Sequence, residues 1–180
     1  MVKKIRLGAG RSALPSAGSI DSQSIKSSCG GEEIGYDGGK KTHGRKRFIL
    51  VDTLGLVLGV YVCAANVSEK EGAKKLLEQL KGETISESLC QDIQKVWVDG
   101  GYRGQELINW VKQIWNWIWE VTLRTDNQKG FVVIPKRWVV ERSFGWMVGA
   151  RRLARDYEKT TQSSVSMIHL AMIRIMLNRL

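Results

Sequence analysis

Three acidic residues that are far apart in the sequence have surroundings in which carboxylates often do chemistry. Asp21 follows a short apolar stretch, and Asp99 ends an apolar run directly before two glycines. Glu141 lies in a segment whose spacing predicts a helix. Carboxylate oxygens are preferred ligands of Mg2+, and two such ions about 4 Å apart can cleave or transfer a phosphodiester. We therefore take Asp21, Asp99 and Glu141 as candidate catalytic and metal-binding residues.

Each of these carboxylates also has a purely structural interpretation. Asp21 is followed by hydroxyl residues and could form a loop Asx-turn. Asp99 could cap the turn or helix that follows it. Arg137 and Glu141 are one helical turn apart, which is the spacing of an ordinary i,i+4 salt bridge. The residues alone leave both interpretations open.

The elements that must position these groups follow from apolar periodicity and turn signals. The hairpin turn is predicted at Asp52 to Gly55, and Ser68 with Glu71 forms a helix-capping box. We expect loops over 1–19 and 22–46, separated by a very short strand ending near Asp21. Strands over 48–51 and 56–62 should follow, then a helix from Ser68 and a strand over 95–99. The rest of the chain should form a helix around 107–111, a strand over 117–123, a helix opened by Pro135 and a last helix over 165–176. This order predicts an α/β fold with a mixed sheet flanked by helices.

Positive charge predicts a polyanionic partner. The chain has 28 lysines and arginines against 18 acidic residues, a formal net charge of +10, and clustered cations bind nucleic acid by releasing counterions. The candidate phosphate contacts are Lys40, Lys41, Arg45, Lys46, Arg47, Arg103, Arg137, Arg142, Arg151 and Arg152. Such runs are also typical of a solvated surface. Five tryptophans, at 97, 117, 119, 138 and 146, could stack on bases, although their spacing is more typical of a core.

Several other classes of protein are disfavoured. The three cysteines are widely separated and form no C-x-x-C pair, so the sequence supports neither a disulfide framework nor a zinc site. The longest apolar stretch, 54–65, is too short to span a bilayer, and the N-terminus has no apolar signal-peptide core. We expect a cytoplasmic protein without a membrane segment.

Ordered motifs make the chain resemble the bacterial insertion-sequence transposases of the DDE type, in the group usually numbered five. The segments are IDSQSIK, GYDGGKKTHGRKRFILVDTLGL, AANVSEKEGA, WVDGGYRG, KGFVVIPKRWVVERSFGW and RRLARDYE, and they cover the chain from Asp21 to its end. The resemblance implies a ribonuclease-H-like fold, with Asp21, Asp99 and Glu141 at the positions of the three catalytic carboxylates. It also implies cleavage at transposon ends and strand transfer into target DNA, with Mg2+ as cofactor and Mn2+ as a substitute.

The resemblance further implies double-stranded DNA as partner, a homodimer on DNA because two ends are cut, and association with the bacterial nucleoid. Asp99 would bridge two metal ions, and Asp21 and Glu141 would each complete one ligand shell. Relatives carry a tyrosine and a lysine where this chain has Ile134 and Val148. Arg151 or Arg152 could replace that lysine.

The domain division that we expect is a basic loop over 1–19, the remnant of a missing N-terminal region, and a catalytic domain over 20–180. Relatives carry a helical DNA-recognition region before the first aspartate, so we expect recognition of transposon ends to be weak or missing here. Two rival functions remain: a nuclease or resolvase of the same fold, and a truncated, inactive remnant that binds DNA non-specifically.

Overall fold

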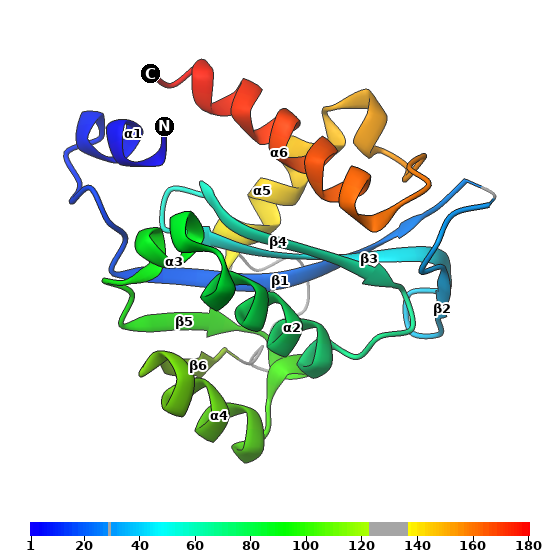
Figure 1. Ribbon diagram of the computed structural model, residues 1–180, viewed down its shortest axis with the longest axis horizontal. Helices are drawn as coiled ribbons and strands as arrows, with labels where there is room; N and C mark the ends of the chain where they lie inside the picture. The colour runs from blue at the N-terminus through cyan, green and yellow to red at the C-terminus, as the bar shows by residue number, and fades with distance from the viewer. Residues whose placement is uncertain (29, 123–136) are drawn as a thin grey trace, which may run out of the picture.

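A mixed sheet of six strands is the centre of the fold in the computed structural model, which describes residues 1–28, 30–122 and 137–180 (Figure 1). The strands are β1 (Ala17–Lys26), β2 (Gly35–Asp37), β3 (Thr42–Asp52), β4 (Val57–Ala64), β5 (Lys95–Val98) and β6 (Ile118–Val121). Their order is β2–β3–β1–β5–β6, and β4 also pairs with β3. β1, β5 and β6 are parallel to one another, whereas β3 is antiparallel to β1, β2 and β4.

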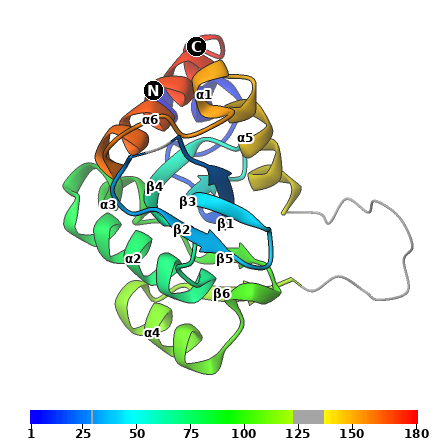
Figure 2. The same cartoon turned by 90° about the vertical axis from the view of Figure 1, so that its right-hand side faces the viewer.

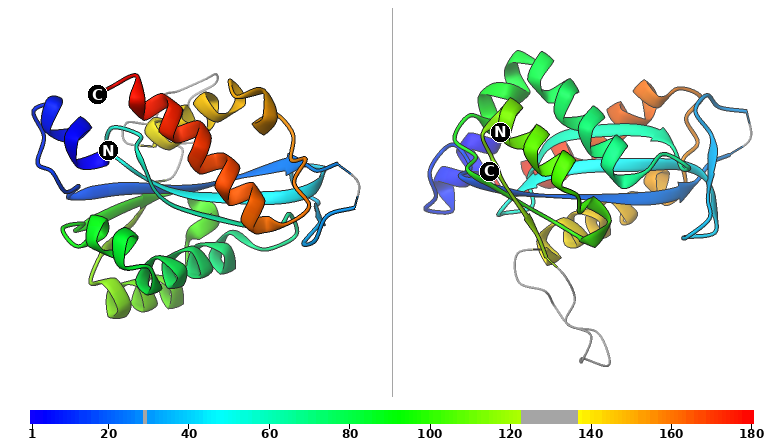
Figure 3. Two further views of the ribbon diagram at one scale, coloured as in Figure 1. Left: turned by 45° about the horizontal axis from the view of Figure 1, so that its top comes forward. Right: turned by 90° about the horizontal axis from the view of Figure 1, so that it is seen from below.

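Helices cover both faces of the sheet. They are α1 (Val2–Gly8), α2 (Glu69–Gly82), α3 (Thr84–Cys90), α4 (Gln105–Trp115), α5 (Trp138–Val148) and α6 (Thr161–Leu177), with short 3-10 turns η1 (Gly100–Tyr102) and η2 (Arg151–Leu153). α2, α3 and α4 lie on one face, and α5 and α6 lie on the other (Figures 2 and 3). No helix in the described ranges is long and apolar enough to cross a membrane. The expected α/β architecture is confirmed.

The sequence signals of the β3–β4 hairpin and of α2 are confirmed in detail. The Asp52 carboxylate accepts hydrogen bonds from the backbone N–H groups of Leu54 and Leu56, which closes the turn. Gly55 has φ +80°, a left-handed conformation that favours glycine. The Ser68 hydroxyl accepts a hydrogen bond from the N–H of Glu71, as the capping box predicts.

Two segments predicted as loops contain regular structure. Residues 2–8 form α1 instead of a basic loop, because one side of this helix is buried against the protein through Val2, Ile5 and Arg6. β1 continues past Asp21 to Lys26, and β3 begins at Thr42, because these polar stretches pair with each other. The helix α3 and the strand β2 were not predicted from the sequence. The expected roles of Leu123, Ile134 and Pro135 lie outside the described residues.

Candidate active site

The register of two parallel strands brings the two aspartates together. Ser19 of β1 pairs with Trp97 of β5. Asp21 and Asp99 each lie two residues beyond this pair, so they are level with each other and on the same side of the sheet. Asp21 is within β1, whereas Asp99 follows the end of β5.

The third carboxylate comes from α5, which packs on β1 and β3. Val140, Phe144 and Met147 of this helix are buried against the sheet. This packing leaves Glu141 exposed at the edge of the helix that is nearest the aspartates.

One guanidinium nitrogen lies among all three carboxylates. Nη2 of Arg137 is 3.8 Å from an oxygen of Asp21, 3.8 Å from one of Asp99 and 3.7 Å from one of Glu141. The Arg137 side chain is buried, and its Nε has no hydrogen-bond partner among the described residues. The structure thus brings the three predicted catalytic residues to one point, around a fourth residue that was predicted to contact phosphate.

The electrostatics of this centre fit a site for cations. Burial raises the pKa of Asp21 to about 6, and the negative charge of Asp99 adds to this rise. The N–H of Ser22 and the charges of Arg137 and Lys40 act in the opposite direction. Three carboxylates facing one guanidinium carry excess negative charge when ionised, and carboxylate oxygens are the donors that Mg2+ prefers.

Arg137 separates the carboxylates from one another. Within the described residues, no three acidic, histidine or cysteine side chains are close enough to share one ion as they stand. The three oxygens face a guanidinium group instead. The donor chemistry therefore fits a divalent metal, provided that Arg137 withdraws from between the carboxylates.

A second layer of polar contacts supports the centre from the α2 side of the sheet. The Ser22 hydroxyl donates to Glu69, and the Lys46 ammonium donates to the same carboxylate at 2.8 Å. Tyr102 is fully buried, and burial raises the pKa of its hydroxyl well above the usual value. Lys40 contacts both Glu69 and the Ser22 carbonyl. The contacts at Ser22 fix the position of β1 directly after Asp21.

Besides Arg137, three of the predicted phosphate contacts are buried. Arg45 and Arg47 both pair with Asp156, which also accepts a hydrogen bond from Ser164. Lys46 is occupied by Glu69, by a neighbouring aspartate and by a backbone carbonyl. These three cations tie β3 to other elements and present no surface to DNA.

The remaining six predicted contacts are more open to solvent. Lys40, Lys41, Arg103, Arg151 and Arg152 are exposed, and Arg142 is half-buried. Arg152 forms an ion pair with Glu158 at 3.0 Å. The structure therefore brings the three carboxylates together but divides the predicted cations into a buried set and an exposed set.

The structural roles considered for Asp99 and Glu141 are present as well, whereas Asp21 lies within a strand and not in a loop Asx-turn. Asp21 accepts a hydrogen bond from the N–H of Ser22, Asp99 accepts one from the N–H of Gly101, and Glu141 pairs with Arg137. These local contacts orient the carboxylates toward the shared point. The catalytic and structural interpretations are thus compatible.

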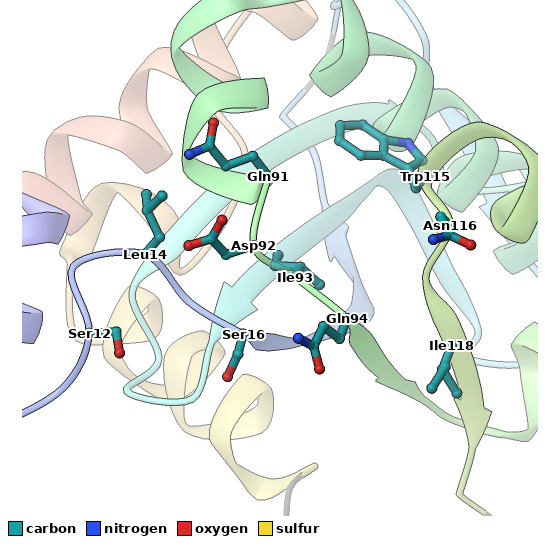
Figure 4. A pocket seen from close by; sticks show the side chains of 10 residues that line it. All are labelled: Ser12, Leu14, Ser16, Gln91, Asp92, Ile93, Gln94, Trp115, Asn116 and Ile118. Carbon is teal, nitrogen blue, oxygen red and sulfur yellow. The ribbon is translucent and has the colours of Figure 1, made fainter.

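A separate hollow of about 700 Å³ lies at the other end of the parallel strands (Figure 4). Its lining comes from the segments that precede β1, β5 and β6, and it includes Asp92, Trp115 and Asn116. Asp21 and Asp99 lie toward the carboxyl ends of β1 and β5, so this hollow is not part of the carboxylate centre.

With the fold and the carboxylate centre established, comparison with known proteins decides the family. Residues 12–176 match the family described as Transposase DDE domain. The chain belongs to this family. None of the curated proteins compared with the chain matches it.

Membership accounts for the main features of the fold. DDE transposase domains are ribonuclease-H-like, and this chain has such a fold: a curled mixed sheet flanked by helices. The matched segment contains Asp21, Asp99 and Glu141 and begins after α1. The helix α1 and the last four residues lie outside it.

Proposed function

We propose that this DDE domain is a DNA transposase that cleaves phosphodiesters at transposon ends and joins them to target DNA. The observation that supports this proposal is the meeting of Asp21, Asp99 and Glu141 around one point, from two adjacent strands and a helix that packs on the first of them. Phosphoryl transfer requires negatively charged ligands on rigid elements. β1, β5 and α5 provide such a scaffold.

The three carboxylates would hold Mg2+, or Mn2+ in its place. The bound metal would activate the attacking oxygen and stabilise the charge that develops at phosphorus. The Asp99 carboxylate would be held in place for this role by the N–H of Gly101 at the start of η1. Arg137 supplies the positive charge that offsets the mutual repulsion of the carboxylates in the described structure.

The substrate would be double-stranded DNA, bound through phosphate contacts around the carboxylate centre. Arg142, which follows Glu141, and the exposed cations supply these contacts: Lys40, Lys41, Arg103, Arg151 and Arg152. Guanidinium groups bind phosphate oxygens with two parallel hydrogen bonds. Cutting at two ends would require a homodimer on DNA.

The test is a joining assay with a labelled, pre-nicked duplex taken from the DNA that flanks the gene. Wild-type protein with Mg2+ or Mn2+ should join the 3′ end to target DNA. Asp99→Asn should lose this activity by at least about a thousandfold while retaining DNA binding, because a metal ligand contributes to the reaction step. The matched control is Asp92→Asn, an exposed aspartate at the opposite end of β5.

The outcomes separate the proposal from its rivals. Metal-dependent joining that Asp99→Asn lacks and Asp92→Asn retains supports a transposase. Hydrolysis without joining favours a nuclease of the same fold. DNA binding without any reaction favours an inactive remnant, and equal loss of binding and joining in Asp99→Asn contradicts the assigned role of this residue.

A further inference from the structure

A column of stacked side chains lies beside Glu141 on the outer surface of α5. The guanidinium carbon of Arg142 is 4.2 Å from the ring centre of Trp138 and 4.7 Å from that of Trp146. Arg179, which follows α6, lies 4.2 Å from the ring centre of Trp146. We call these four residues the Trp–Arg stack. It joins the helix that carries Glu141 to the last residues of the chain.

Both guanidinium groups of the stack also reach the same backbone oxygen. Arg142 donates to the carbonyl of Leu54 at 3.1 Å, and Arg179 donates to it at 3.5 Å. Leu54 is in the β3–β4 turn, which contacts α5. The Ser143 hydroxyl of this helix donates a hydrogen bond to the carbonyl of Gly55 at 3.0 Å. Two positive charges are therefore held side by side by a rigid turn.

Within the described ranges, neither guanidinium group has a carboxylate partner. Asp52 is the acidic residue whose charge acts on Arg142, but its own carboxylate pairs with Arg6 and closes the hairpin turn. Nε of Arg142 is buried without a hydrogen-bond partner among the described residues. Burial, and then the charge of Arg179, lower the pKa of Arg142. The pair thus lacks a counter-charge.

The type of ligand follows from which atoms are free. Each guanidinium has five N–H donors, and the Leu54 carbonyl occupies one donor of each. The ring of Trp146 already contacts two guanidinium groups, which leaves less of its surface for stacking on a base. The available groups are N–H edges, and such edges bind the oxygens of a phosphate.

We propose that Arg142 and Arg179 form a binding site for one phosphate of the DNA strand that runs along α5 past Glu141. The proposal rests on the proposed function, because it takes DNA as the substrate. It adds Arg179, which lies beyond the matched family segment, to the DNA-binding surface. The site would hold the strand at a fixed distance from the catalytic carboxylates.

The first experiment measures binding of a fluorescent duplex in EDTA at several KCl concentrations, so that no reaction step contributes. The association constant K falls as salt rises. Arg179→Gln should make the negative slope of log K against log salt shallower by about 0.9, the value for one lost phosphate contact. The matched control is Lys112→Gln, which removes one charge from α4 on the opposite face. Equal slopes for the two variants would overturn the proposal.

A second experiment locates the phosphate. Single phosphates of the duplex are replaced by neutral methylphosphonates, one position at a time. Replacement at one position should weaken DNA binding by the wild-type protein. The same replacement should not weaken binding by Arg179→Gln, because this variant already lacks the contact. Arg142→Gln should show the same position, and Arg142→Lys should restore part of the loss. Additive effects at every position would contradict a shared phosphate site.

A third measurement separates failure of this site from failure of the proposed function. Phenylglyoxal modification of Arg142 and Arg179 is followed by mass spectrometry, with pyrophosphate alone or with duplex. Protection by duplex supports the proposal. Protection by pyrophosphate without DNA binding would show an anion site that does not serve DNA and would overturn the assigned ligand. Absence of protection together with metal-dependent joining would reject the site and leave the transposase intact.

Discussion

Asp21 in β1 and Asp99 directly after β5 lie level with each other, each with a carboxylate oxygen 3.8 Å from the same nitrogen of Arg137. This relationship depends on strand register, since a shift of one residue would turn one of the two side chains to the opposite face. The backbone ladder between β1 and β5 therefore sets the geometry of the centre. A loop could not hold the carboxylates with the same precision.

The raised pKa of Asp21 predicts a pH-dependent stability. The folded protein binds this proton more tightly than the unfolded chain, so the metal-free protein should lose stability as the pH rises from 3.8 to about 6. The full cost is about 2–3 kcal/mol, because one pKa unit corresponds to about 1.4 kcal/mol. Asp21→Asn should remove this cost. Urea unfolding in EDTA between pH 4 and 7.5 should therefore show a variant that matches wild type at pH 4 and is more stable above pH 6.

Control variants make this experiment specific. Asp92→Asn removes an exposed carboxylate and should follow the wild-type pH profile. Addition of Mg2+ above pH 6 should stabilise wild type more than Asp21→Asn, because a bound cation offsets the repulsion between ionised carboxylates. A constant difference between Asp21→Asn and wild type across the pH range would refute the explanation.

Arg137→Gln should make folding more dependent on metal. The variant leaves the three carboxylates without their shared counter-charge, so the metal-free protein should lose about 1–3 kcal/mol. Mg2+ should then bind about tenfold more tightly, a further ~1.4 kcal/mol of stabilisation at saturation. Thermal unfolding with and without Mg2+ measures both effects. Arg103→Gln, which removes an exposed charge, is the control, and an equal Mg2+ response in the two variants would speak against a metal site around Arg137.

Local patterns in the sequence predicted the parts of the structure that depend on neighbouring residues. The turn at Asp52 to Gly55 and the Ser68 cap were predicted correctly because each is made within five residues. The proximity of Asp21 and Asp99 was expected from the resemblance. Its geometric cause, the pairing of β1 with β5, is not visible in either segment alone.

Long-range contacts explain what the sequence did not reveal. The basic run around Arg45 has the composition of a DNA-binding surface, yet Arg45 and Arg47 are buried because β3 is a central strand. Their carboxylate partner, Asp156, lies 111 residues beyond Arg45 in the sequence. The pairing partner of a buried charge has no local signature. In the same way, α1 could not be predicted from a short basic segment, because its position depends on the contact between Arg6 and Asp52.

Asp156→Asn should unfold the connection between β3 and the segment before α6. The side chain of Asp156 is fully buried and is the carboxylate partner of both Arg45 and Arg47. Its removal leaves two buried cations without a counter-charge, at an expected cost of about 3–5 kcal/mol in the free energy of unfolding. Urea unfolding measures the loss. Glu158→Gln removes a nearby carboxylate that pairs with exposed Arg152, so it should cost less than about 1 kcal/mol.

Arg6→Gln tests whether α1 is an integral part of the fold. Arg6 is buried, pairs with the Asp52 carboxylate and donates to the Ser12 carbonyl, so it fixes α1 to the β3–β4 turn. The variant leaves Asp52 buried without its cation and should lose about 3–4 kcal/mol. Lys3→Gln removes an exposed charge from the same helix and should change stability by less than about 0.5 kcal/mol. The backbone N–H groups of Leu54 and Leu56 donate to Asp52, so their hydrogen exchange should be faster in Arg6→Gln but not in Lys3→Gln. Unchanged exchange at Leu54 and Leu56 in Arg6→Gln would mean that α1 does not support the turn.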